Sequence, residues 1–150
     1  MVVSIGSDHG GFSQKRLLAD HIRGMGFTVL DRGPDDETSV DYPDYAEKVA
    51  LDVAHGDARF GILVCGTGIG MAIAANKVKG IRAANVTIPE FAKLSREHND
   101  ANVLTLSGRF VDPETNIEIV ETFLATKFEG GRHERRVGKI SDMEDADESE

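Results

Sequence analysis

The sequence has little cysteine, little positive charge and no long apolar run. Its 150 residues include one cysteine, which excludes an internal disulfide framework and favours a reducing compartment. No apolar stretch is long enough to cross a bilayer. Residues 1–6 lack the basic region and the cleavage pattern of a signal peptide. We therefore expect a cytoplasmic protein that does not enter membranes.

Positive charge is scarce relative to negative charge. The chain has 17 Lys and Arg against 26 Asp and Glu, a formal net charge of -9 at pH 7. Proteins that bind nucleic acid do so largely by neutralising phosphates, so this balance argues against a nucleic-acid partner. Residues 141–150 hold six acidic residues and no basic one. We expect this acidic tail to be a solvated, frayed end that follows a single domain over residues 1–140.

Apolar runs alternate with helical patterns along the chain. Five short runs have the length and composition of strands, at residues 2–6, 27–30, 60–65, 82–86 and 103–106. The run at 60–65 has no charged residue, which is typical of a strand buried on both faces. Helical patterns separate the runs. This alternation predicts an α/β fold, namely a three-layer α/β/α sandwich with a Rossmann-like, five-stranded parallel sheet.

Local signals indicate where three of the helices begin. Pro43 suits the first turn of a helix. The segment Thr87-Ile88-Pro89-Glu90 has the form of a capping box, which predicts a helix that starts at Thr87. Asp112-Pro113 predicts the start of a last long helix, whose apolar residues extend to Phe128.

The loop at residues 65–70 carries the strongest functional signal. Ligands of parallel α/β sheets bind beyond the carboxyl ends of the strands, where this loop is expected together with residues 7–11 and 107–110. Its sequence is Cys65-Gly66-Thr67-Gly68-Ile69-Gly70. Glycines let the backbone approach a ligand closely, and the N–H groups at a helix start face an anion. The same environment stabilises negative charge on a thiol and offers donors to a developing oxyanion.

Glycine-rich loops of three other kinds fit these residues to different degrees. A dinucleotide-binding loop would follow the first strand and have glycine where this chain has Met71. A P-loop would contain Gly-Lys followed by Ser or Thr, which the segment lacks. A tight turn around an inert, buried cysteine stays open on the residues alone.

Charged residues are expected in the neighbouring loops of the same sheet edge. Asp8 and His9 follow the first predicted strand, and Arg109 follows the fifth. A histidine in a glycine-rich loop can contact phosphate or a sugar hydroxyl. A loop-capping aspartate beside a solvated histidine accounts for Asp8 and His9 equally well.

His98 and a pair of arginines complete the candidates. His98 shares a predicted helical face with Phe91 and Leu94, so it is either a packing histidine or an acid–base group. Arg132 and Arg136 are four residues apart and fall on one face if the segment is helical, where they suit phosphate oxygens or simple solvation. The Cys and His spacing fits no zinc pattern, so no metal is expected.

Several motifs occur in an order that resembles one enzyme family. They are Gly6-Ser7-Asp8-His9-Gly10-Gly11-Phe12, Asp41-Tyr42-Pro43, Cys65-Gly66-Thr67-Gly68-Ile69-Gly70, Ala74-Ala75-Asn76-Lys77, Gly80-Ile81-Arg82-Ala83, Ser95-Arg96-Glu97-His98-Asn99-Asp100 and Glu129-Gly130-Gly131-Arg132-His133. The chain is similar to the type B ribose-5-phosphate isomerases, within a group of sugar-phosphate isomerases that includes galactose-6-phosphate isomerase. The resemblance runs from Ile5 to about Ile140.

The resemblance implies roles for the candidate residues. Cys65 would move a proton between C1 and C2 of the sugar, and Thr67 and His98 would assist ring opening. The other residues would bind the enediolate, the sugar or its phosphate: Gly66, Thr67, Gly68, Ile69, Gly70 and Asn99 for the enediolate, Asp8 for the sugar, and His9, Arg109, Arg132 and Arg136 for hydroxyls or phosphate. Members of this family need no cofactor. They form homodimers, sometimes tetramers, whose sites are shared between subunits.

The expected reaction interconverts ribose 5-phosphate and ribulose 5-phosphate in the pentose phosphate pathway. The alternative is a six-carbon substrate, allose 6-phosphate or galactose 6-phosphate. Two functions of other classes are also compatible with parts of the pattern. One is a cysteine hydrolase that uses Cys65, His98 and Asp100, and the other is a flavodoxin-like binding module.

Overall fold

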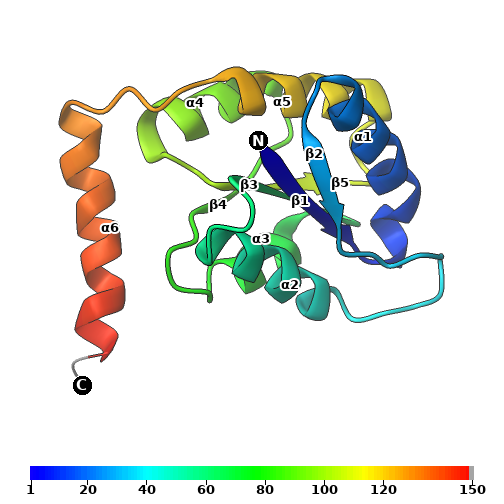
Figure 1. Cartoon of the computed structure of the whole chain (residues 1–150), viewed down its shortest axis with the longest axis horizontal. Coiled ribbons are helices and arrows are strands. Elements are labelled where there is room, and N and C mark those ends of the chain that lie inside the picture. Colours follow the sequence, from blue (N-terminus) through cyan, green and yellow to red (C-terminus); the bar gives the residue numbers. More distant parts are fainter. Residues whose placement is uncertain (149–150) are drawn as a thin grey trace.

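A computed structural model describes residues 1–148 of the chain. Within them, five strands form one parallel sheet in the order β2-β1-β3-β5-β4 (Figure 1). The strands are β1 (Val2–Ser7), β2 (Thr28–Asp31), β3 (Phe60–Cys65), β4 (Ala83–Asn85) and β5 (Val103–Ser107). The helices are α1 (Phe12–Gly24), α2 (Tyr42–Ala54), α3 (Ile69–Ala75), α4 (Pro89–Asn99), α5 (Pro113–Ala125) and α6 (Arg132–Glu148), and a 3-10 turn, η1 (His9–Gly11), precedes α1.

Helices cover both faces of the sheet. In Figure 1, α1, α4 and α5 lie on one side of the strands and α2 and α3 on the other. Each face has its own apolar core, one centred on residues such as Ile62, Leu104 and Phe123, the other on residues such as Leu63 and Met71. The predicted three-layer sandwich with five parallel strands is therefore confirmed.

Burial along the strands follows their place in the sheet. All six residues of the central strand β3 are buried, as are all five of β5. The edge strands β2 and β4 have no fully buried residue. An apolar strand gains most from burial on both faces, which explains why the prediction for residues 60–65 matches the observed bounds.

The order of the strands brings three loops together. From β1 the chain crosses to β2 on one side and returns to β3 on the other, so β1 and β3 flank a switch in the direction of winding. Such a switch leaves a crevice at the carboxyl ends of the strands. Ser7 pairs in register with Val64, and Cys65 with Ser107. The segments after β1, β3 and β5 therefore start at one level.

Two expectations about helix ends are corrected. The capping box predicted at Thr87 is absent, because α4 starts at Pro89, Ile88 is its N-cap and no side chain caps it. A capping box at Thr87 would require the helix to start one residue earlier. The helix after Asp112 does begin with a capping bond, from Thr115 N–H to the aspartate, but it ends at Ala125 and a further helix follows it.

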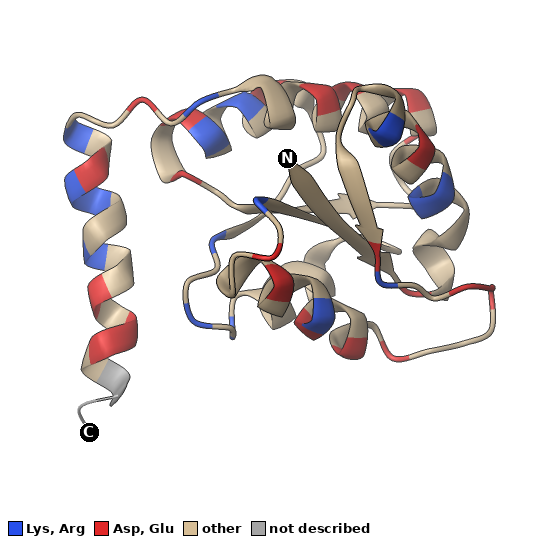
Figure 2. Ribbon diagram, in the orientation of Figure 1, with Lys and Arg blue, Asp and Glu red and all other residues tan. Residues whose placement is uncertain are grey.

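The acidic tail is not frayed where the structure describes it. Helix α6 continues through Glu148 without a break at residue 140, and residues 149 and 150 lie outside the described part. Its basic residues lie in its first half and most of its acidic residues lie near its end (Figure 2), opposite to the arrangement that the helix dipole favours. Contacts with the body hold it instead. Glu144 accepts a hydrogen bond from Gly80 N–H at 2.7 Å, and Asp145 pairs with Lys79 at 3.1 Å.

None of the helices in the described part of the chain is long and apolar enough to span a membrane.

Candidate active site

Cys65 lies at the carboxyl end of the central strand, inside the glycine loop. Its thiol is buried, with 6% of the residue exposed, and its Sγ accepts a hydrogen bond from Gly68 N–H at 3.1 Å. Gly68 has a φ of +83°, which only glycine adopts readily, and it leads the chain into α3. Thr67 is exposed, and its Oγ1 accepts from Ile69 N–H at the start of α3. The loop thus directs a backbone N–H at the sulfur of Cys65.

The loop after β5 supports the glycine loop. Gly108 N–H donates to Cys65 C=O at 2.8 Å, and Arg109 N–H donates to Gly66 C=O at 3.2 Å. A methyl group added to Gly66 would lie 3.7 Å from Nη1 of the Arg109 guanidinium. Arg109 therefore lies against the Cys65 loop, at the edge of the sheet where its position after the fifth strand predicted it.

The loop after β1 also lies against Gly66 and Arg109. Asp8 N–H donates to Val64 C=O, and the Asp8 carboxylate accepts from Gly11 N–H at 3.1 Å. A methyl group added to Gly10 would lie 3.6 Å from Gly66 N and 3.8 Å from Arg109 Nη2. The loops that carry Asp8, Cys65 and Arg109 thus lie together at the carboxyl edge of the sheet.

His9 is held in one tautomer by a loop that precedes α2. Its Nδ1 accepts a hydrogen bond from Val40 N–H at 3.2 Å. A ring nitrogen that accepts carries no hydrogen, so the neutral ring has its hydrogen on Nε2. His9 therefore offers a donor, as an oxyanion or a sugar hydroxyl requires.

Tyr42 belongs to this site, although sequence reasoning assigned it no role. Its ring lies against Gly70, where an added methyl group would be 2.5 Å from Tyr42 Cε1. Tyr42 is the first residue of α2 and is 40% exposed. The motif Asp41-Tyr42-Pro43 marked the helix start, but no local pattern connects it with a loop some 30 residues later.

Within one chain, His98 and Asn99 lie far from Cys65. They end α4, which runs back from the carboxyl edge of the sheet to the start of β5. Gly61 pairs with Val103 and Cys65 with Ser107, so the start of β5 lies four residues from the level of Cys65. At about 3.3 Å per residue that is about 13 Å along the strand. His98 and Asn99 therefore lie at the amino edge.

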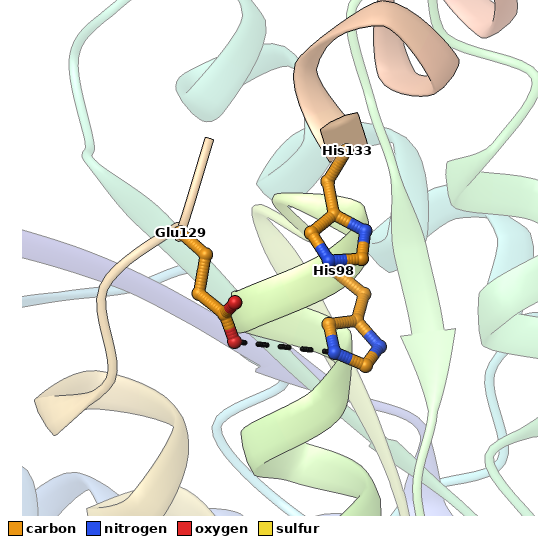
Figure 3. Close-up of side chains that lie close together, drawn as sticks. All are labelled: His98, Glu129 and His133. Carbon is orange, nitrogen blue, oxygen red and sulfur yellow. Dashed lines mark ion pairs between the residues drawn. The ribbon is translucent and has the colours of Figure 1, made fainter. Parts of the chain in front are cut away.

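A second cluster forms around His98 (Figure 3). The His98 and His133 rings stack with centroids 4.3 Å apart, and Glu129 Oε1 lies 4.0 Å from His98 Nε2. Arg132 and Arg136 belong to the same first turns of α6, which confirms that the arginine pair is helical. The candidate residues thus fall into two groups, one on each edge of the sheet.

His133 is a member of this second cluster that sequence reasoning left without a role. It is buried, with 7% exposed. Burial, His98 and Arg132 all lower the pKa of its ring. The ligand atoms of His98, Glu129 and His133 lie within 4.8 Å of one another. The two ring planes are only 14° apart, however, so the nitrogen lone pairs run side by side and do not converge on one ion.

The comparison with known proteins identifies the family. A sequence model described as Ribose/Galactose Isomerase matches residues 3–140. The chain belongs to this ribose/galactose isomerase family. The "Probable ribose-5-phosphate isomerase B" of Mycoplasma pneumoniae is 50% identical over 139 residues, which are 92% of this chain and 91% of the relative. The resemblance expected from the motifs is confirmed.

Solved structures of the family have the same fold. Ribose-5-phosphate isomerase B of Clostridium thermocellum superimposes with a TM-score of 0.96 at 51% identity, over 97% of this chain and 99% of that one. The Mycoplasma genitalium enzyme, solved with bound ribulose-5-phosphate, superimposes with a TM-score of 0.92 at 47% identity, over 96% of both chains. The family fold thus extends over nearly the whole chain.

Proposed function

We propose that this chain is an aldose–ketose isomerase that interconverts ribose 5-phosphate and ribulose 5-phosphate. The observation that carries the proposal is the Cys65 loop: a buried thiol, a backbone N–H 3.1 Å from its sulfur, and a guanidinium beside the same glycines. About 50% identity to ribose-5-phosphate isomerase B over almost the whole chain supports the choice of substrate.

Cys65 acts as the base. As a thiolate it removes the proton from C2 of the open-chain aldose, so that the C–H electron pair forms a C1=C2 double bond and the carbonyl pair moves onto the oxygen at C1. In the resulting enediolate the C2 hydroxyl passes its proton to the C1 oxygen and becomes the carbonyl, while the thiol returns a proton to C1. A positioned base contributes about 10²–10⁴-fold to such a step. Backbone donors of residues 66–70 stabilise the enediolate without a metal.

A second copy of the chain completes the site. Thr67 and His98 assist opening of the furanose ring, yet they lie at opposite edges of the sheet in one chain. A homodimer resolves this separation when the amino-edge cluster of one copy faces the Cys65 loop of the other. In that arrangement Asn99 also reaches the enediolate.

Hydrogen-bond donors from both edges of the sheet bind the phosphate. His9 and Arg109 contribute from the copy that holds the reacting Cys65, and Arg132 and Arg136 from the partner copy. Guanidinium groups pair with phosphate oxygens through two parallel hydrogen bonds, which fixes the far end of the sugar. The phosphate takes no part in the chemistry, so its binding serves to orient C1 and C2 at Cys65.

Replacing the thiol tests the assignment of the base. We expect Cys65→Ala to lower kcat by at least about 10²-fold, because no other base replaces the sulfur. Binding of ribitol 5-phosphate, which lacks the carbonyl, should stay within about threefold because phosphate and hydroxyl contacts remain. Full activity in Cys65→Ala would remove Cys65 from the mechanism.

The identity of the sugar is tested by comparing substrates. We expect kcat/KM for ribose 5-phosphate to exceed that for allose 6-phosphate and galactose 6-phosphate by at least about tenfold. Incorporation of solvent deuterium at the transferred position distinguishes isomerisation from hydrolysis. A preference for either six-carbon substrate would establish the alternative that the family description leaves open.

A further inference from the structure

We propose that Ser107 is a positioning residue, which fixes the peptide group between Gly66 and Thr67 so that Thr67 N–H is available to the enediolate. The inference rests on the proposed isomerase function and adds to it a residue outside the glycine loop. It concerns how one backbone donor is held in place.

The Ser107 hydroxyl connects the β5 loop with the glycine loop through two hydrogen bonds. Ser107 is 2% exposed, at the end of β5 and in register with Cys65. Its oxygen accepts a hydrogen bond from Phe110 N–H at 2.9 Å, so its own hydrogen is free to donate. It donates to Gly66 C=O at 2.7 Å. The hydroxyl thus pulls this carbonyl toward the β5 loop.

The direction of one carbonyl determines the direction of the next N–H. In a trans peptide group the C=O and N–H bonds point in opposite directions. Since Gly66 C=O faces Ser107 and Arg109 N–H, Thr67 N–H faces away from them, on the exposed side of the loop. No acceptor among residues 1–148 takes this hydrogen. Gly68 N–H, in contrast, is already bound to the Cys65 sulfur.

Ser107 is itself held by a buried polar network. Asn116, which is fully buried on α5, donates through Nδ2 to Ser107 C=O at 2.9 Å and to Gln14 Oε1 at 2.7 Å. Gln14 on α1 donates to the carbonyls of Gly108 and Val111. Hydrogen bonds in such a low-dielectric interior are strong and costly to break. The network therefore fixes the start of the β5 loop to two helices.

A donor held in advance of the reaction is worth more than one that must reorient. Removing a whole oxyanion donor costs about 10²–10³-fold in rate. Without the Ser107 hydroxyl, Gly66 C=O would keep only the Arg109 N–H at 3.2 Å, and one hydrogen bond would hold the peptide group less firmly than two. The expected loss in rate is therefore smaller than that of a complete donor, about tenfold to a hundredfold.

The test compares Ser107→Ala with Ser95→Ala in the full-length protein. Ser95 is a matched control, because it is also buried and donates to one backbone carbonyl, Ala92 C=O, at 2.8 Å. We expect Ser107→Ala to lower kcat about tenfold to a hundredfold with KM within about threefold. Ser95→Ala should keep kcat within about threefold.

Two ligands separate positioning from general damage. A phosphorylated hydroxamate that mimics the enediolate should lose affinity for Ser107→Ala in parallel with kcat/KM, whereas ribitol 5-phosphate should bind within about threefold of wild type. Ser107→Thr, which retains the hydroxyl, should recover kcat to within about threefold. If Ser107→Ala does not fold, Ser107→Cys takes its place, and we expect the same loss of affinity for the hydroxamate and the same unchanged affinity for ribitol 5-phosphate.

Three results would overturn the inference. They are an unchanged kcat in Ser107→Ala, an equal loss of affinity for both ligands, and a Ser107→Thr protein as slow as Ser107→Ala. A wild-type protein that does not isomerise ribose 5-phosphate would instead overturn the proposed function, so the two failures are distinct.

Discussion

Gly11 and Gly24 lie at the two ends of α1 and differ in what a side chain would meet. A methyl group added to Gly11 would be 2.5 Å from Val64 C=O, a backbone atom of the central strand. The same addition to Gly24 meets nothing within 4 Å. Gly11 is thus required for close contact between the start of α1 and the strand that leads to Cys65.

This difference predicts opposite effects of two equivalent substitutions. Gly11→Ala should lower the free energy of unfolding by about 1–3 kcal/mol, since backbone must shift to admit the methyl group. Gly24→Ala should leave it unchanged or raise it by up to about 1 kcal/mol, because alanine favours a helix. Urea denaturation of both variants measures the two values. Equal stability of the two proteins would contradict the close contact.

Asp100 shows how a single residue shapes the second cluster. It is the only non-glycine residue within residues 1–148 with a positive φ, +48°, and it ends α4 directly after Asn99. Arg96 donates to its carboxylate at 2.9 Å, and Arg82 donates to its backbone carbonyl at 2.8 Å. These two arginines stabilise a conformation that is unfavourable for most side chains, and so hold His98 and Asn99 in position.

At the scale of elements, α4 and α6 meet through His98 and His133. The pKa of His133 is lowered chiefly because burial disfavours the charged ring, and His98 and Arg132 add repulsion. Protonation of His133 therefore opposes the packing of α6 on α4. We therefore expect the contact between these helices to weaken at low pH.

The sign of the pH effect follows from proton binding. The ordinary histidine pKa is about 6.5, and the pKa of His133 in the folded protein is lower. Between these two values the unfolded chain binds a proton at His133 and the folded chain does not. The free energy of unfolding should fall as the pH decreases from about 6.5 through this range and be independent of His133 above it. Urea denaturation at several pH values and constant protein concentration measures the slope.

A variant assigns this slope to one residue. His133→Asn should show a shallower decrease in stability below about pH 6.5 than the wild type. Identical slopes in wild type and His133→Asn would show that His133 does not resist protonation.

At the scale of the whole molecule, the two groups of candidate residues lie at opposite edges of the sheet within one chain. Cys65, Asp8 and Arg109 lie at the carboxyl edge, and His98 and Asn99 at the amino edge. A site shared between two copies predicts that two inactive variants restore each other. In a mixed dimer of Cys65→Ala and His98→Ala, one of the two sites contains both intact residues and the other contains neither.

The share of wild-type activity that the mixture of Cys65→Ala and His98→Ala recovers follows from how the subunits combine. Random mixing gives half mixed dimers with one working site each, so about one quarter of wild-type kcat should return. Mixed dimers purified with two different tags should have about one half. If each site were formed within one chain, every mixture would stay at the level of its inactive parents.

Much of the fold follows from the sequence because strands, helices and their loops are set by neighbouring residues. The apolar run at 60–65 has no other stable environment than the centre of a sheet, and its loop leads directly into α3. Two local predictions, one about a helix start and one about the acidic tail, were wrong. The capping box at Thr87 was not used, and the charged segment after residue 140 formed a helix through contacts with Lys79 and Gly80.

The sequence by itself determined the alternating α/β fold, the family and the place of Cys65 at the end of a buried strand. Only the tertiary structure decided that His98 lies at the opposite edge, that Tyr42 packs on Gly70 and that Ser107 holds Gly66. The physical reason is the large separation in sequence between the residues that touch. Residues 28 to 41 positions apart meet because strands pair and helices run back over them, and no periodicity or local motif encodes which of them will touch.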